Sequence, residues 1–256
     1  MSINLPSVSI IPISGIPMIQ AGDDLAAIIL DALKQAGISL QSGDVLVITS
    51  KIVSKAEGRL VDLQTVRPGE QAIQLAEATH KDPRIVELIL RESCYISRQK
   101  PGTLIVQHRL GFISASAGID QSNVRGSDEF VLLIPENPDA TAESLRACFQ
   151  AAAGATVGII ISDSHGRPFR LGNVGVAIGV AGMPALVDLR GQPDLFGRDL
   201  HITIQGYADM VASAALLVIG ESNEGLPVAL LRGLRFPPIE GHASDLYRPV
   251  EQDMYR

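Results

Sequence analysis

The stretch Gly43-Asp44-Val45-Leu46-Val47-Ile48-Thr49-Ser50-Lys51 decides the fold class of this 256-residue chain. Its central run, Val45 to Thr49, is apolar and β-branched, which is typical of a buried strand. The residues before it, Asp23 to Gly37, place apolar side chains at helical spacing between two acidic residues at the start and a glycine at the end. A helix followed directly by a buried strand predicts an α/β protein.

The flanking sequence continues this alternation of helices and strands. We expect further strands at Val8–Ile13, Tyr95–Ser97, Leu104–Val106, Phe112–Ser114, Phe130–Ile134, Thr156–Ile161 and Val228–Leu231. We expect further helices at Glu70–Thr79, Pro83–Arg91, Asn137–Ala152 and Asp199–Leu217. No repeat or linker divides residues 1–256, so we predict one domain, with any division into two lobes falling in its loop-rich middle. We interpret the tail after Arg235 as a surface extension.

Composition and charge exclude several classes of protein. The formal charge of −7 argues against a broad nucleic-acid surface, which would need many Lys and Arg contacts to phosphate. The longest uncharged run, Leu171 to Val187, is interrupted by Gly and Pro, so no membrane span is expected, and nothing resembles a signal peptide. We therefore expect a cytoplasmic protein. Cys94 and Cys148 lack metal-type spacing, and we interpret both as reduced core residues.

Three carboxylates follow apolar or small-residue runs, each beside residues that favour turns. They are Asp120 after Ala117-Gly118-Ile119, Asp163 after Ile161-Ser162, and Glu221 after Val218-Ile219-Gly220. Several carboxylates brought together repel one another unless a hard cation neutralises them, and Mg²⁺ or Mn²⁺ prefers oxygen ligands. Taken singly, each acid also fits a solvated turn or a helix cap, and spacing alone does not show that the three converge.

Two basic segments complete the candidate site. Thr49 to Arg59 carries two lysines and an arginine directly after the buried strand, which suits a triphosphate or, equally, a solvated charged loop. In Ser164 to Asn173, His165 could be an acid–base group or a structural histidine, while Arg167 and Arg170 could clamp a carboxylate or phosphate. The sequence contains no GxxxxGK[ST], no GxSxG and no GxGxxG, and close backbone packing explains Gly172, Gly175, Gly179 and Gly182 better than a dinucleotide site.

Five ordered motifs then carry a resemblance that spacing alone does not provide. They are Gly15-Ile16-Pro17, the block Thr49 to Arg59, Ala117-Gly118-Ile119-Asp120-Gln121-Ser122-Asn123-Val124, Asp163-Ser164-His165-Gly166-Arg167-Pro168-Phe169-Arg170, and Gly220-Glu221-Ser222-Asn223-Glu224-Gly225-Leu226-Pro227. The series resembles that of the F420-0:γ-glutamyl ligase family, over about Ile10 to Gly233.

The resemblance implies a ligase that uses GTP, two divalent cations (Mg²⁺ or Mn²⁺) and K⁺ to join L-glutamate to coenzyme F420-0. It implies an unusual α/β fold with mixed sheets and no P-loop, in an intertwined homodimer. The positions that match GTP-contacting motifs are Ile16, Pro17, Met18, Ile19, Ser50, Lys51, Lys55, Asn123, Ile219, Gly220, Glu221, Ser222, Asn223, Glu224, Gly225 and Leu226. The positions that match metal ligands are Asp120, Asp163, Ser164 and Glu221.

Two departures from the family pattern affect these expectations. The family commonly has Thr-Phe where this chain has Ser164-His165, so we expect metal binding to survive through the hydroxyl and substrate fit to change. The chain also ends before the nitroreductase-like domain that some relatives carry, which makes it resemble the stand-alone form. Two alternatives stay open: a ligase of the same fold acting on another carboxylate, with ATP possible, and a nucleotide-binding module without catalysis.

Overall fold

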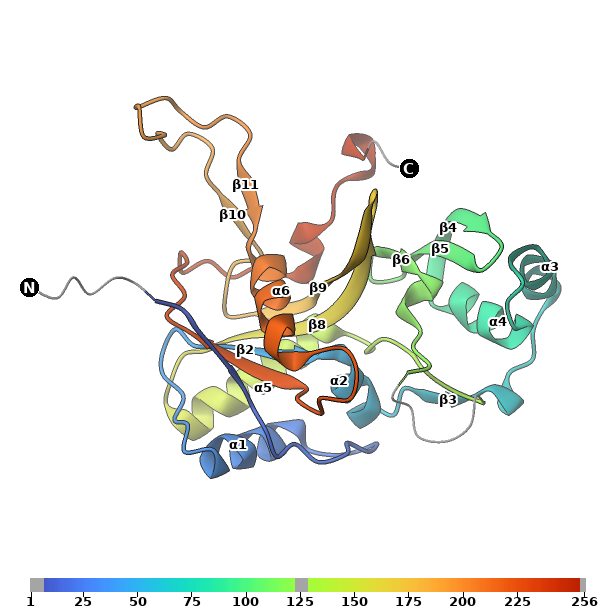
Figure 1. Cartoon of the computed structure of the whole chain (residues 1–256), viewed down its shortest axis with the longest axis horizontal. Helices are drawn as coiled ribbons and strands as arrows, with labels where there is room; N and C mark the ends of the chain where they lie inside the picture. The colour runs from blue at the N-terminus through green and yellow to red at the C-terminus, as the bar shows by residue number, and fades with distance from the viewer. Residues whose placement is uncertain (1–6, 123–128, 254–256) are drawn as a thin grey trace, which may run out of the picture.

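The computed structural model describes residues 7–122 and 129–253, and its main body is built on a five-stranded sheet. The strands follow the order β1 (Ser9–Pro12), β12 (Val228–Arg232), β2 (Val45–Thr49), β8 (Gly158–Arg167) and β9 (Arg170–Ala181). Only the β2–β8 pair within this sheet is parallel; its other pairs are antiparallel. The sheet is drawn at the centre of Figure 1. This architecture confirms the predicted mixed α/β class.

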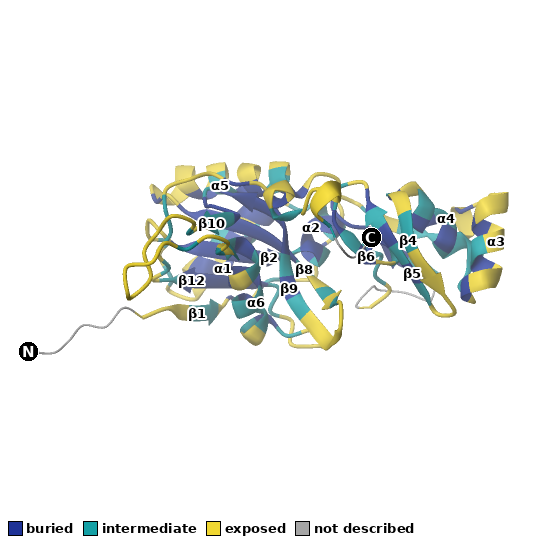
Figure 2. Cartoon of the chain, turned by 90° about the horizontal axis from the view of Figure 1, so that it is seen from above, coloured by how far each residue is buried: buried dark blue, intermediate teal, exposed yellow. Residues whose placement is uncertain are grey.

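Alternation of side chains along the strands gives the sheet two apolar faces. Leu46 and Ile48 of β2 pack into one core with α1 (Leu25–Gln35) and α5 (Pro138–Ala153). Val45 and Val47 point the other way and pack against α6 (Tyr207–Ile219). Figure 2 shows the buried residues concentrated in these strands and the exposed ones on the outer sides of the helices. The sheet is therefore covered on both faces, as its continuous run of apolar residues requires.

A smaller lobe lies between α2 (Ser50–Ala56) and α5 in the sequence, at one end of the molecule in Figure 1. Its elements are α3 (Glu70–Thr79), α4 (Pro83–Arg91), β4 (Ser93–Lys100), β5 (Thr103–His108), β6 (Ile113–Ala115) and the 3₁₀ helix Ser116–Gly118. They share an apolar core that includes Val86, Ile89 and Val106. The strands β3 (Leu60–Asp62) and β7 (Phe130–Leu132), with the 3₁₀ helix Leu63–Thr65, join this lobe to the main body.

An arm projects from the main body beside α6 (Figure 1). Its base is the two-stranded sheet of β10 (Leu186–Asp188) and β11 (Ile204–Gly206). Large apolar side chains along it are almost wholly exposed: Leu195 at 99%, Phe196 at 90% and Ile202 at 89%. Such exposure of large apolar groups on a projecting segment indicates a contact surface.

Most predicted elements are confirmed, and β2, α3 and α4 have the predicted bounds. The prediction for α6 is wrong at its start: residues 199–203 belong to the arm, and the helix begins at Tyr207. The interpretation of Thr49–Arg59 as a possible charged loop is also wrong, because Ser50–Ala56 forms α2. Within residues 7–122 and 129–253, no helix combines the length and the apolar character that crossing a bilayer requires.

Two further expectations are corrected. Cys94 and Cys148 are free thiols but are exposed rather than buried, because they lie on outward-facing positions of β4 and α5. The segment after Arg235 is not a loose surface extension. It contains the 3₁₀ helices Ala243–Leu246 and Val250–Gln252, and Ala243 is 2% exposed against the α6 side of the core.

Close backbone packing is confirmed for Gly175 and Gly179 of β9 and for Gly182, where a Cβ would lie 2.7 Å from the carbonyl oxygen of Val157, but it is wrong for Gly172, which has φ +84° and only Arg167 Nη2 nearby, at 3.9 Å. A Cβ at Gly175 would lie 2.5 Å from the carbonyl oxygen of Ala212 in α6, and one at Gly179 would lie 2.5 Å from the carbonyl of Pro138 at the start of α5. Each contact is with backbone, which cannot swing aside as a flexible side chain does. Helices on both faces of the sheet therefore approach β9 more closely than any larger residue allows.

We expect Gly179→Ala to lower the free energy of unfolding by about 1–3 kcal/mol, because the added methyl overpacks the contact between β9 and α5. Gly166→Ala is the matched control in the same hairpin, since the nearest neighbour of the added methyl would be Asn173 Oδ1 at 3.9 Å. The chain has no Trp, so urea unfolding followed by circular dichroism measures both. Equal stability of the two variants would contradict this account of the β9 glycines.

Candidate active site at the edge of the central sheet

Backbone hydrogen bonds bring the predicted nucleotide-binding segments together at one end of the central strands, where β2 ends and β12 begins. The Thr49 N–H at the end of β2 donates to the carbonyl of Pro227 over 3.0 Å, and the Ile13 N–H donates to the carbonyl of Val228 over 2.8 Å. Thr49 is also the register partner of Ser162, the residue before Asp163. The segments that contain Ile16–Ile19, Ser50–Lys55 and Ile219–Leu226 therefore meet where β2 ends and β12 begins.

Helix α2 places its first two side chains on two different predicted metal ligands. Ser50, 6% exposed, donates its hydroxyl to Asp163 Oδ1 over 3.1 Å. Lys51 Nζ lies 2.6 Å from Asp120 Oδ2 and 3.0 Å from Ser122 Oγ. Since α2 follows β2 without an intervening loop, the end of the buried strand fixes both contacts. The fold therefore brings these four predicted residues together, while their roles in binding stay predictions.

The loop that carries Asp120 also approaches Asp163 directly. A Cβ on Gly118 would lie 3.6 Å from Asp163 Oδ2, and Gly118 has φ +68°. Burial alone would raise the pKa of Asp120, but hydrogen bonds from Lys51 and from the Ser122 N–H outweigh it and hold the pKa below its usual value. Asp120 is therefore charged at neutral pH, with a cation beside it.

The second lysine of α2 lies in a less polar environment. Burial first, and then the positive charge of Lys51, lower the pKa of the Lys55 ammonium, while Asp120 raises it. Two ammonium groups one helical turn apart provide a concentrated positive field beside the carboxylates. This arrangement suits an anionic ligand such as a phosphate chain.

The remaining predicted ligands are less closely gathered. Asp163 lies inside β8, not after its strand as the sequence suggested, because β8 continues to Arg167 in a hairpin with β9. Strand alternation puts the exposed Ser164 on the opposite face from Asp163. Glu221 contacts Asn173 of β9, with 3.4 Å between Asn173 Nδ2 and Glu221 Oε2. Within residues 7–122 and 129–253 no three acidic, His or Cys side chains are grouped closely enough to hold a metal.

Contacts of Glu224 with nearby residues shape the segment Ile219–Leu226. Gly220 adopts φ +73° at the end of α6, where a Cβ would collide with the Glu224 carboxylate. Glu224 accepts a hydrogen bond from the Ser222 N–H over 2.8 Å. In the segment before α1, Ile19 is buried whereas Met18 is 70% exposed. Asn123 lies outside the described residues, so its predicted contact with GTP stays a prediction.

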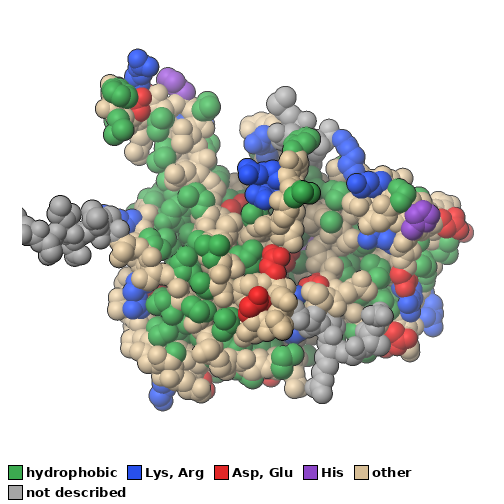
Figure 3. Space-filling model, viewed as in Figure 1, with side chains coloured by type: hydrophobic (Ala, Val, Ile, Leu, Met, Phe, Trp, Pro, Cys, Tyr) green, Lys and Arg blue, Asp and Glu red, His purple; other side chains and the backbone are tan. Residues whose placement is uncertain are grey.

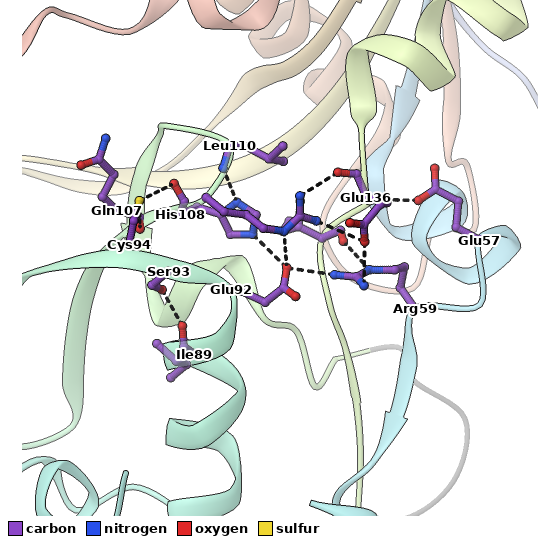
Figure 4. A network of polar contacts seen from close by, with 12 residues as sticks. Glu57, Arg59, Ile89, Glu92, Ser93, Cys94, Gln107, His108, Leu110 and Glu136 are labelled. Atoms are coloured by element: carbon purple, nitrogen blue, oxygen red, sulfur yellow. Dashed lines mark hydrogen bonds and ion pairs between the residues drawn. The ribbon is translucent and has the colours of Figure 1, made fainter. Parts of the chain in front are cut away.

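A network of charged residues fixes the smaller lobe beside this site, as Figure 4 shows. Glu92 Oε2 lies 2.9 Å from Arg59 Nη2 and 3.2 Å from Arg109 Nε. Both arginines also contact Glu136, at 3.0 Å and 3.4 Å. Although burial opposes ionisation, His108 Nε2, which lies 3.4 Å from Glu92 Oε2, and the charges of the arginines lower the pKa of Glu92 to about 2.

Aromatic rings connect this network to the sheet. His108 is fully buried and stacks on Phe112, with ring centroids 4.7 Å apart and an interplanar angle of 6°. Phe112 in turn lies 5.2 Å from the ring of His165 and 6.4 Å from that of Tyr247. The sequence indicated His165 but gave no signal for Phe112, Asn173 or the pairing of Ser50 with Asp163, which only the folded chain brings together.

Charge distribution on the surface follows the same geometry. Figure 3 shows acidic side chains in the middle of the viewed face, below the β8–β9 hairpin, with Lys and Arg side chains beside that hairpin. The protein is therefore of the mixed α/β class, and acidic and basic side chains lie together at the ends of its central strands. Its sequence has no P-loop motif. In open α/β sheets, ligands bind outside the carboxyl ends of the strands.

Comparison with known proteins identifies the family. The family described as F420-0:Gamma-glutamyl ligase matches residues 15–233, and the chain belongs to it. Coenzyme F420:L-glutamate ligase of Methanothermobacter thermautotrophicus is 43% identical over 97% of this chain and 99% of its own length. The proteins of the same name from Methanopyrus kandleri and Archaeoglobus fulgidus are 44% and 39% identical, over 98% and 97% of this chain and 99% and 96% of their own lengths.

Proposed function

We propose that this protein is a GTP-dependent ligase that adds L-glutamate to coenzyme F420-0, first as an amide and then through γ-glutamyl linkages. The observation that carries the proposal is the meeting of Ser50, Lys51, Asp120 and Asp163 at one sheet edge. Family membership and the names of the similar proteins supply the acceptor and the amino acid. The sequence has no P-loop motif, and we propose that the nucleotide binds where these residues meet.

The chemistry of ligation explains why these side chains are needed. A carboxylate is a poor electrophile because its negative charge repels an incoming amine. We propose that an acceptor carboxylate oxygen attacks the γ-phosphorus of GTP, the bond to the β-phosphate oxygen breaks, and GDP leaves. The product is an acyl phosphate, whose carbonyl carbon the deprotonated amine of glutamate attacks. The carbon–oxygen bond then breaks and inorganic phosphate leaves with one former carboxylate oxygen.

The lysines of α2 provide the positive charge that this route requires. Lys51 and Lys55 would lie beside the transferred phosphoryl group, where fixed charge stabilises the transition state. Ser50 and Lys51 also hold Asp163 and Asp120, so the same helix links the basic and the acidic parts of the site. No protein nucleophile takes part in this route.

The chemistry of the donor atoms suits a hard divalent cation, although within residues 7–122 and 129–253 the acids are not yet grouped closely enough to hold one. Asp120 and Asp163 offer carboxylate oxygens, and Asp120 Oδ2 with Ser122 Oγ already converges on a cationic group, the ammonium of Lys51. We propose that Asp120, Asp163 and Glu221, with Ser164, hold Mg²⁺ or Mn²⁺, and that K⁺ assists. A bound divalent cation supplies neutralisation of phosphate charge. Because Ser164 lies on the opposite face of β8 from Asp163, both Glu221 and the local conformation of the β8–β9 hairpin must change for all four residues to contribute.

We further propose that the protein is a homodimer. Leu195, Phe196 and Ile202 on the arm are exposed apolar side chains, which a protein partner would bury, and we propose that this partner is a second copy of the chain. Light scattering of the purified protein measures the oligomeric state directly.

The activation step has a direct test. With GTP labelled in the γ-phosphate and hydroxylamine in place of glutamate, we expect the hydroxamate of F420-0 and labelled inorganic phosphate. Oxygen-18 from the acceptor carboxylate should appear in that phosphate. GMP with pyrophosphate, or label held on the protein, would refute the acyl-phosphate route. Phosphate release with a different carboxylate alone would indicate the other ligase, and no release would indicate a binding module.

A further inference from the structure

Both oxygens of the Asp163 carboxylate accept a hydrogen bond from a side chain. Ser50 donates to Oδ1 over 3.1 Å, and Nε2 of His165 lies 3.0 Å from Oδ2. A carboxylate oxygen accepts, so this contact is a hydrogen bond to Asp163 in the tautomer of His165 that carries its proton on Nε2. In residues 7–122 and 129–253, these two are the side-chain hydrogen bonds that Asp163 makes.

His165 is itself held firmly in place. It lies two residues after Asp163 on β8, so both side chains are on the same face of the strand. Its side chain is 13% exposed, and its ring packs against that of Phe112. Phe112 stacks on His108, whose Nδ1 accepts a hydrogen bond from the Leu110 N–H over 3.1 Å. The imidazole therefore cannot rotate away from Asp163 without disturbing the smaller lobe.

We propose that His165 is a positioning residue for the reaction: it fixes the orientation of the Asp163 carboxylate so that this group is ready to hold a divalent cation. The inference rests on the proposed function, in which Asp163 is a metal ligand. Partners that hydrogen-bond to a ligating carboxylate orient it, and their removal typically weakens metal binding by about 10–100-fold. Ser50 restrains one oxygen, and His165 restrains the other.

Two substitutions separate hydrogen bonding from packing. His165→Phe keeps a ring against Phe112 but removes the donor. His165→Gln removes the ring but can present an amide N–H near the position of Nε2. We expect His165→Phe to bind Mn²⁺ about 10–100-fold more weakly than wild type, and His165→Gln to recover much of that loss. The control is His80→Gln, at the exposed C-cap of α3 and 85 residues before His165 in the sequence; it should bind Mn²⁺ as wild type does.

Mn²⁺ binding is measured by electron paramagnetic resonance of the free ion, in parallel with the Mn²⁺ concentration that half-activates the enzyme at saturating GTP. The KM for glutamate should stay unchanged, and circular dichroism should show unaltered thermal unfolding. Equal Mn²⁺ affinity of His165→Phe and wild type would overturn the positioning role while leaving the proposed function intact. Failure of the wild type to bind or require a divalent cation would instead overturn the metal site, and this inference with it.

Discussion

Asp163→Asn is expected to lower ligase kcat/KM by about 1,000-fold or more while the fold is retained. Asn has the shape of Asp, but its amide offers one acceptor oxygen in place of two, so it cannot accept from both Ser50 and His165, and as a neutral group it is a poor ligand for a hard cation. A bound metal stabilises several kcal/mol of transition-state charge, and each 1.4 kcal/mol corresponds to about tenfold in rate. Steady-state phosphate release with GTP, F420-0 and glutamate measures the effect.

The matched control for this change is Asp82→Asn. Asp82 caps α4 in the smaller lobe and pairs with Arg84, and Asn is an equally good N-cap, so activity should be that of wild type. Turnover of Asp163→Asn close to wild type at ordinary Mg²⁺ or Mn²⁺ concentrations would rule out its role as a ligand.

Of the substitutions considered for stability, Glu92→Ala is expected to lower the free energy of unfolding most, by about 3 kcal/mol at neutral pH. Removing Glu92 leaves Arg59, Arg109 and His108 facing a site without its carboxylate, and uncompensated charge with little access to water is costly. The loss lies at the lower end for buried ion pairs because Glu136 still pairs with both arginines. Glu143→Ala, which removes an exposed partner of Arg146, should cost at most about 1 kcal/mol.

The pH dependence of this difference provides an independent check. Glu92 has a pKa of about 2 in the folded chain against an ordinary value of 4.5, so its ionised form stabilises the native state. That contribution is complete above pH 4.5 and is lost as the pH falls toward about 2. The stability difference between wild type and Glu92→Ala, from urea unfolding, should therefore be constant at neutral pH and shrink below pH 4.5. A difference that stays constant to pH 3 would show that the pairing does not depend on this ionisation.

The sequence predicted the buried parts of the fold best, because there a local pattern and the tertiary environment agree. The run Val45–Thr49 is apolar on both faces, and the sheet is covered on both faces. The predictions were wrong where the local sequence pattern and the tertiary environment disagree. The apolar residues before α6 mimic an amphipathic helix, yet they are exposed on the arm, and α2 is a short, charged helix without a side-chain cap.

The candidate site was predictable in its members but not in its arrangement. Motifs singled out Ser50, Lys51, Asp120 and Asp163, which the fold brings together from three segments. No local pattern could show that Asp163 continues as a paired strand residue, because its place depends on β9 folding back along β8. Nor could spacing show that Phe112, from the smaller lobe, packs against His165.

The parallel pairing of β2 with β8 has a consequence for how the chain folds. Val45 and Gly158 are register partners although about 110 residues separate them, and closing so long a loop must precede any favourable contact between the strands. The intervening smaller lobe has its own apolar core and mostly local connections, so it can assemble earlier and shorten the search. We therefore expect formation of the central sheet, and with it the junction between Ser50 and Asp163, to be the late and slow event in folding.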